Sequence, residues 1–248
     1  MSPEAASPAT RPLLAVDRLV KRFGGFRALD ELSFTLRPGE ILGLVGPNGS
    51  GKTTCINVIS GLYAPDGGQV LFDGYSIAGL KSHRLSHLGI NRTFQVPKPF
   101  PSLTVRENVE VANGHRRRAV DKVEIDALLD RLDLLSLAAR RAGELNSGQQ
   151  KMLDLARALA TGPKLLLVDE LAAGLNPTEL HHMAARLKDL ARQGIALLVV
   201  EHLLGFIDEI TDRVIVMNAG REIFEGVLAD AAREPRVVEV FLGGSDAF

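Results

Sequence analysis

Short runs of consecutive apolar residues occur at several places along the chain. They occupy residues 41–45, 165–168, 195–200 and 214–217. Apolar runs of this length, without polar alternation, are typical of parallel strands that are covered on both faces. Between the second and third runs, residues 177–192 carry apolar side chains at the spacing of one helix face. The order strand, helix, strand predicts a parallel sheet in an α/β fold.

A second kind of strand pattern lies nearer the N-terminus. Residues 13–20, 33–36 and 69–72 are shorter segments in which apolar and polar side chains alternate. Alternation is typical of antiparallel strands with one face on the core and one in water, so we expect an antiparallel edge layer. Residues 1–11 are rich in Pro, Ser and Ala and are expected to form a disordered tail, with 12–248 as one domain.

The middle of the chain has a helical pattern instead. A cluster of prolines close to residue 100 interrupts regular structure, and helical patterns follow at residues 105–114, 121–132 and 147–160. No strong strand pattern lies among them. We therefore expect a helical subdomain at about residues 96–160, inserted into the α/β core.

Composition narrows the classes of protein that fit this pattern. The chain has 248 residues, of which 46% are hydrophobic and 24% charged, with a net charge of −1. This balance excludes a disordered chain, and the near-zero charge gives no field that would attract nucleic acid. A single cysteine cannot form an internal disulfide, which fits a reducing compartment. No apolar run approaches the ~18 residues of a membrane-spanning helix.

The apolar run at residues 41–45 leads into a phosphate-loop pattern, G-x-x-x-x-G-K-[ST], with a predicted helix after it. The residues are Gly46, Pro47, Asn48, Gly49, Ser50, Gly51, Lys52, Thr53 and Thr54. Glycines let backbone N–H groups point at an anion, and the helix N-terminus adds partial positive charge. We expect Lys52 to contact the β- and γ-phosphates of a nucleotide and Thr53 to ligate Mg²⁺.

Two acidic residues, Asp169 and Glu170, follow directly after the apolar run at 165–168. A phosphate loop needs a carboxylate at the end of a neighbouring strand, and we expect Asp169 to hold the Mg²⁺ shell there. Glu170 is the candidate general base that polarises an attacking water. The Asn-Lys-x-Asp pattern of GTPases is absent from the sequence, which favours ATP over GTP.

Further motifs follow in order along the chain. They are Phe23 before two glycines, Gln95 in Arg-Thr-Phe-Gln, the run Leu145-Asn146-Ser147-Gly148-Gln149, the run Ala173-Gly174-Leu175-Asn176, and His202. Together with the phosphate loop they resemble the ATP-binding subunits of ABC transporters, over nearly the whole chain after the tail. The resemblance implies a P-loop NTPase (RecA-like) core with the antiparallel edge layer and the inserted helical subdomain.

The resemblance also implies a role for each motif. Phe23 stacks on adenine, Gln95 senses Mg²⁺ and the attacking water, and His202 contacts the γ-phosphate. Asn146, Ser147, Gly148 and Gln149 form the signature motif, which contacts the γ-phosphate held by a partner ATPase subunit. Two ATP molecules would lie between two head-to-tail subunits, and their closure would drive two membrane-spanning permease subunits. The chain would then be peripheral, on the cytoplasmic face of the inner (plasma) membrane.

Two positions depart from the common family pattern. Asn146 stands where the signature motif usually has Ser, and Asn176 stands where the crossing loop often has Asp. Asn is a good N-cap and carries two amide donors, so Asn146 can cap the following helix and reach phosphate. Its longer side chain could equally misplace the γ-phosphate contact and leave ATP hydrolysis weak or dependent on a partner.

Finer resemblance points to importers of branched-chain amino acids and of related small polar solutes such as amides and urea. The segments that carry it are residues 21–25, 92–95, 172–177 and the C-terminal residues 234–243, where this branch has a short helix. Such importers use a periplasmic or extracellular solute-binding protein, and they commonly pair two different ATPase subunits. Either a homodimer or a heterodimer is therefore open.

Other classes of function stay open at this point. A soluble ABC-type ATPase acting on the ribosome or DNA usually fuses two ATPase units or inserts long coiled coils, and neither pattern is present. An exporter ATPase or a non-catalytic nucleotide-binding regulator would also carry a phosphate loop. The resemblance implies that residues 97–105 line the groove that receives a membrane subunit, and an ordinary proline-rich loop is the alternative. Residues 115–118 are expected to form a solvated basic turn, or else to contact lipid headgroups or a partner loop.

Overall fold

The computed structural model describes residues 11–114 and 120–242. Residues 1–10 of the tail expected at 1–11, and the basic turn at 115–118, lie outside the described residues. The strands are β1 (Leu14–Phe23), β2 (Phe26–Leu36), β3 (Ile41–Val45), β4 (Gly67–Phe72), β5 (Tyr75–Ser76), β6 (Ile90–Arg92), β7 (Leu165–Asp169), β8 (Ala196–Val200), β9 (Arg213–Asn218) and β10 (Arg221–Gly226). The helices are α1 (Lys52–Ile59), α2 (Ser82–Leu88), α3 (Val105–Asn113), α4 (Lys122–Arg131), α5 (Ser147–Ala160), α6 (Pro177–Arg192), α7 (Leu204–Ile210), α8 (Leu228–Ala231) and α9 (Pro235–Leu242), with short 3₁₀ turns η1 (Leu135–Leu137) and η2 (Ala142–Glu144).

Two sheets organise the molecule. The larger sheet has the order β10-β9-β3-β8-β7-β6, and its strands are parallel except for β10, which pairs antiparallel with β9. The smaller sheet has the order β2-β1-β4-β5 and is antiparallel throughout. The predicted fold class, an α/β core with an antiparallel edge layer, is confirmed.

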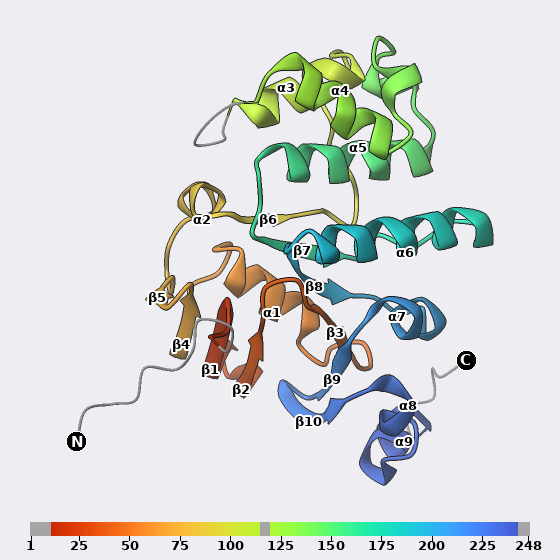
Figure 1. Cartoon of the computed structure of the whole chain (residues 1–248). Helices are drawn as coiled ribbons and strands as arrows, with labels where there is room; N and C mark the ends of the chain where they lie inside the picture. The colour runs from red at the N-terminus through yellow and green to blue at the C-terminus, as the bar shows by residue number, and fades with distance from the viewer. Residues whose placement is uncertain (1–10, 115–119, 243–248) are drawn as a thin grey trace.

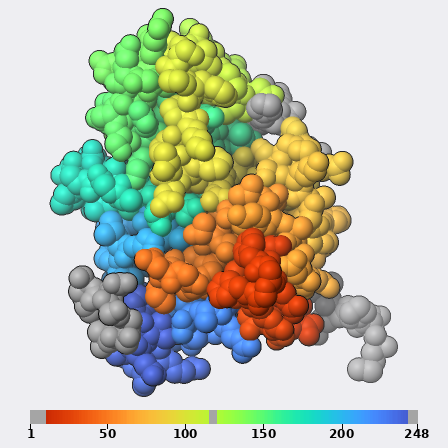
Figure 2. Space-filling view, turned by 180° about the vertical axis from the view of Figure 1, so that it is seen from behind, coloured from red at the N-terminus to blue at the C-terminus, as the bar shows by residue number. Residues whose placement is uncertain are grey.

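The helices α3, α4 and α5 lie together at one end of the molecule, beyond the parallel sheet (Figure 1). From behind, the segment that contains residue 100 lies on the surface between these helices and the N-terminal sheet (Figure 2). Apolar side chains form two buried clusters: one joins the sheet to α3–α6, and the other lies between the two sheets and includes α1. Within the described ranges, no helix combines the length and apolar character of a membrane span.

The register of the parallel strands determines where the polar motifs meet. β3, β7 and β8 are buried along their full length, and Asp169 of β7 stands opposite Val200 of β8. Parallel strands end at the same edge of a sheet, so the residues that follow each strand come together there. The phosphate loop after β3, Glu170 after β7 and His202 after β8 therefore share one edge.

Candidate functional site

Close backbone packing shapes the phosphate loop between β3 and α1. Gly46 has φ 144° and Gly51 has φ 107°, both in the region that favours glycine. A Cβ at Gly46 would lie 2.2 Å from the carbonyl oxygen of Met217 in β9, and a Cβ at Gly51 would lie 2.5 Å from that of Ala28 in β2. Only glycine fits at these two positions, because the backbones of β9 and β2 pack directly against the loop.

Lys52, the first residue of α1, folds back over this loop. Its Nζ donates to the carbonyl oxygens of Gly46 at 2.7 Å and Pro47 at 2.9 Å, and it is 5% exposed. Burial lowers the pKa of Lys52, while the nearby carboxylates of Glu170 and Asp169 act in the opposite direction. The ammonium group therefore lies among the loop carbonyls and faces both acids at the end of β7.

Asp169 is buried at the end of β7 and is held by an arginine from the next strand. Arg92 in β6 donates to Asp169 Oδ2 at 2.7 Å and to Asn57 Oδ1, in α1, at 2.6 Å. Arg92 thus joins the helix of the phosphate loop to the carboxylate at the strand end. Because Oδ2 accepts from Arg92, the other oxygen of Asp169 is the one left to face a metal.

Glu170 is contacted by two other residues for which the sequence predicted a function. Gln95 Nε2 donates to Glu170 Oε2, and His202 Nε2 forms a 2.8 Å hydrogen bond with Glu170 Oε1. The backbone of Glu170 has φ 49°, which is uncommon for a residue other than glycine and is often found at active sites. Two residues from distant parts of the sequence thus converge on the Glu170 carboxylate.

The residues predicted to hold Mg²⁺ are Thr53, Gln95 and Asp169. Each offers oxygen: a hydroxyl, an amide carbonyl and a carboxylate, which is the donor chemistry that Mg²⁺ prefers. Thr53 follows Lys52 in the first turn of α1 and is exposed, whereas Asp169 is 3% exposed. The donor set therefore fits this metal.

The signature residues form the start of α5. Asn146 is the N-cap: its Oδ1 accepts from Gln149 N at 2.8 Å, and Gln149 Oε1 accepts from Asn146 N at 3.1 Å. These two bonds form a capping box. The cap uses Oδ1, and the amide NH₂ group of Asn146 takes no part in it.

Phe23 and Asn176, two further residues with predicted roles, lie at the periphery of the sheet edge that carries the phosphate loop. Phe23, at the end of β1, is 44% exposed, and its ring packs edge-on against Tyr63 at 5.2 Å between centroids. Asn176 caps α6, with its Oδ1 accepting from Glu179 N at 3.0 Å. Gly174, with φ 74°, turns the chain between Glu170 and this cap.

Several contact residues escaped the sequence analysis. They are Asn57, Tyr63, Arg92, Lys151 and Glu201. None belongs to a motif whose chemistry could be derived from a single sequence, and each acts through a partner that is distant in sequence. Arg92 is part of the Arg-Thr-Phe-Gln motif that contains Gln95, and Glu201 directly precedes His202; these positions are the signal that could have identified them.

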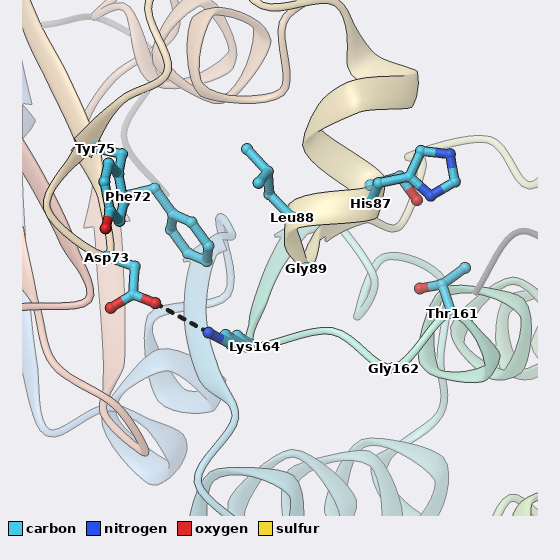
Figure 3. Close-up of a pocket in the computed structure, with 10 residues that line it drawn as sticks. Phe72, Asp73, Tyr75, His87, Leu88, Gly89, Thr161, Gly162 and Lys164 are labelled. Carbon is cyan, nitrogen blue, oxygen red and sulfur yellow. Dashed lines mark hydrogen bonds and ion pairs between the residues drawn. The ribbon is translucent and has the colours of Figure 1, made fainter. Parts of the chain in front are cut away.

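A separate surface groove lies between the β4–β5 hairpin, α2 and the loop before β7 (Figure 3). Lys164 and Asp73 form a 3.0 Å ion pair across it, and both side chains are more than half exposed. Lys164 precedes β7, whereas Asp169 ends it, so the groove lies at the opposite edge of the sheet from the residues above.

Comparison with known proteins identifies a family profile and individual proteins that this chain matches. The profile of the ABC transporter family matches residues 29–173. A protein of Archaeoglobus fulgidus named probable branched-chain amino acid transport ATP-binding protein LivG is 39% identical, over 95% of this chain and 97% of its own length. The high-affinity branched-chain amino acid transport ATP-binding protein BraF of Pseudomonas aeruginosa is 34% identical, over 94% of this chain and 99% of its own.

Solved structures give the same result. The ADP conformation of MJ1267, an ATP-binding cassette of an ABC transporter, superposes with a TM-score of 0.85 at 35% identity, covering 94% of this chain and all of that one. The dimeric structure of MJ0796, described as a bacterial ABC transporter cassette, has a TM-score of 0.77 at 27% identity, covering 87% of this chain and 98% of that one.

Proposed function

Because the chain belongs to the ABC transporter family, we propose that it is the ATP-binding and ATP-hydrolysing subunit of an importer of branched-chain amino acids or related small polar solutes. The contact of Glu170 with both Gln95 and His202, beside Lys52, is the observation that supports this proposal most strongly. It gathers a candidate base, a polar positioning group and a histidine next to a phosphate loop. A base and a group that positions water beside a phosphate loop are what phosphoryl transfer to water uses.

The residues of the loop would bind the phosphates. Backbone N–H groups of residues 48–53 would cradle the β- and γ-phosphates, and Lys52 would exchange the carbonyls of Gly46 and Pro47 for phosphate oxygens. Thr53, Gln95 and Asp169 would hold Mg²⁺, which supplies charge neutralisation at the phosphates when bound. Phe23 would provide the aromatic surface for adenine.

Glu170 would act as the general base. Its carboxylate would accept the proton of a water aligned with the γ-phosphate, while Gln95 would orient that water and His202 would hold the carboxylate and contact the γ-phosphate. Asn146, Ser147, Gly148 and Gln149 would bind the γ-phosphate on the partner subunit at the N-terminus of α5. The dimeric neighbour MJ0796 supports a paired arrangement.

The substrate class and partners are proposed from the relatives. Those at 34–39% identity are named branched-chain amino acid transport ATP-binding proteins, and the alignments span nearly the whole chain. The α9 helix, Pro235–Leu242, supports the assignment to this branch, for which the sequence predicted a C-terminal helix at about residues 234–243. Two permease subunits, a second ATPase subunit and a solute-binding protein would complete the importer, and the site for a membrane subunit would lie at residues 97–105.

The variant Glu170→Gln tests the ATPase and the assembly together. Loss of the base is expected to lower the rate of ATP hydrolysis by about 10²–10⁴-fold while ATP still binds, as measured by phosphate release and equilibrium binding. Glu124→Gln, at an exposed carboxylate in α4, is the control and should hydrolyse ATP like the unsubstituted chain.

Tagged Glu170→Gln chain, purified with ATP from gently solubilised membranes, should bring with it two multi-span subunits. The same complex assembled with the unsubstituted chain, reconstituted in vesicles with its binding protein, should take up labelled leucine, isoleucine or valine, or else urea. Recovery of ribosomes or of soluble proteins alone would contradict the importer and favour a soluble ATPase.

A further inference from the structure

The segment Glu170 to Ala173 lies between two buried side chains of opposite charge. Lys151, in the second turn of α5, is 5% exposed, and Glu201, which follows β8, is 3% exposed. No motif assigns a role to either residue. Their hydrogen bonds with this segment offset the free-energy cost of burying two ionisable groups.

Lys151 binds the segment through its carbonyl oxygens. Its Nζ donates to Leu171 O at 3.0 Å and to Ala173 O, and it lies 3.5 Å from Glu170 O. An ammonium group has three N–H donors and no acceptor, so this set of carbonyls matches its bonding capacity. The contact also joins the helix that begins at the signature residues to the segment that carries the candidate base.

Glu201 binds the same segment through an N–H group. Its Oε1 accepts from Ala172 N at 2.6 Å. The peptide units therefore present carbonyls to the cation and an N–H to the anion. This charge complementarity, together with the hydrogen bond from Glu170 N to Val200 O, favours the one conformation of the segment in which Glu170 has a positive φ.

From this arrangement we propose that Lys151 and Glu201 are positioning residues for ATP hydrolysis: together they fix the backbone of Glu170 so that its carboxylate meets Gln95 and His202. The inference rests on the proposed ATPase function and deepens it. Neither residue needs to touch ATP. Lys151 belongs to α5, which begins at the signature residues. A displacement of these residues would therefore displace Glu170 through the hydrogen bonds that Lys151 makes with its segment.

The test separates the rate of hydrolysis from nucleotide binding. In the full chain, Lys151→Met is expected to lower kcat by about 10²-fold, because a small misplacement of a catalytic group has that cost. The Kd for ATP should stay within about twofold, since the phosphate loop and Lys52 are unchanged. Lys151→Arg, which keeps a cationic donor, should recover part of kcat.

Glu201 gives an independent test in case Lys151→Met fails to fold. Glu201→Gln keeps an amide oxygen that can accept from Ala172 N and should retain most of kcat. Glu201→Met removes the acceptor and should reduce kcat about as much as Lys151→Met, again without weakening ATP binding. Lys164→Met is the matched control, because Lys164 pairs with exposed Asp73 at the other edge of the sheet and its loss should leave kcat unchanged.

Each outcome has a distinct meaning. If the unsubstituted chain hydrolyses ATP and both methionine variants keep its kcat, the positioning role is wrong while the proposed function stands. A parallel loss of ATP binding and kcat in the folded variants would also overturn it, since it would indicate a general structural defect. If the unsubstituted complex hydrolyses no ATP, the proposed function itself fails.

Discussion

Asn146 caps a helix and, in the proposed function, also contacts a ligand. Its Oδ1 caps α5, and its amide NH₂ takes no part in the capping box. Ser, the residue that the family commonly has there, is also a good N-cap, but it presents a shorter hydroxyl. The sequence could therefore predict the cap from residue type and position, whereas the effect on the γ-phosphate depends on a partner subunit.

Substitution at Asn146 separates these two roles. Asn146→Ser should keep the stability of the chain and should preserve or raise its rate of ATP hydrolysis, because the cap remains and the shorter side chain relieves crowding at the γ-phosphate. Asn146→Ala should lower the free energy of unfolding by about 1 kcal/mol through loss of the cap. Denaturant unfolding and phosphate release measure the two effects, and a clear loss of hydrolysis in Asn146→Ser would contradict the first.

Glu201 has a pKa that predicts a pH dependence of stability. Burial raises the pKa of Glu201 to about 7, helped by the nearby Glu170 carboxylate and opposed by the N–H groups of Ala172 and His202 and by Lys151. The ordinary value is 4.5, so between pH 4.5 and about 7 the folded chain holds a proton that the unfolded chain has released. This contribution is fully present below pH 4.5 and is lost as the pH rises through 7.

Glu201→Gln should remove this contribution. The free energy of unfolding of the unsubstituted chain should fall between pH 5 and pH 8 more steeply than that of the variant, as measured by urea unfolding at each pH. The difference between the two curves isolates Glu201 from the other titrating groups. Parallel curves for the two proteins would show that Glu201 does not titrate in this range.

Residues of the site fall into two groups according to how well the sequence could predict them. Lys52, Asp169, Glu170 and His202 follow strands that the apolar runs reveal, so register and motif together indicate where they meet. Lys151 could not be predicted because its partners are backbone carbonyls, which carry no sequence signal. A site residue can be predicted from the sequence when its own side chain carries the chemistry. It cannot be predicted when it acts by binding the backbone of a loop.

At the scale of elements, predictability follows length and burial. The helices α5 and α6 have the bounds that periodicity predicts, because each repeats an apolar face over several turns and has a capping box. β6 spans only Ile90–Arg92 and mixes one buried residue with partly buried polar ones, so it has no readable period. β10 is amphipathic and mostly half-buried, which also weakens its pattern.

The phosphate loop is the element whose glycines can be tested most directly. Gly46→Ala places a Cβ against the carbonyl of Met217 at a φ of 144°, so we expect a loss of at least about 2 kcal/mol in the free energy of unfolding. Gly174→Ala is the matched control: its φ is 74°, but no atom lies within 4 Å of the added Cβ. That change should cost about 1 kcal/mol.

Equal losses from the two glycine variants, measured by thermal or urea unfolding, would show that backbone strain alone sets the cost. A larger loss in Gly46→Ala would show that the contact with β9 matters. The phosphate loop would then be held by the sheet before any nucleotide binds, which is the preorganisation that an anion site needs.

Across the whole molecule, α1 joins the nucleotide edge to the core between the two sheets. It starts at Lys52 in the phosphate loop, and Ile56 and Ile59 are fully buried in the cluster that both sheets share. Its partner Arg92 extends the connection to Asp169. Nucleotide binding at one end of α1 is therefore expected to stabilise the packing of both sheets.

The labelling rate of the single cysteine of the chain tests whether nucleotide binding stabilises the core through α1. Cys55 is fully buried in α1, and burial raises the pKa of its thiol to about 12, so a thiol reagent can reach it only when the surrounding structure opens. Ligand at 100 times its Kd stabilises the bound state by about 2.7 kcal/mol, so ADP with Mg²⁺ should slow labelling by up to about 100-fold.

Labelling in denaturant, with and without ADP, is the control and should be fast in both. Protection of the folded chain would show that nucleotide binding stabilises α1 together with the core, whereas equal labelling rates with and without ADP would show that α1 opens independently of the phosphate site.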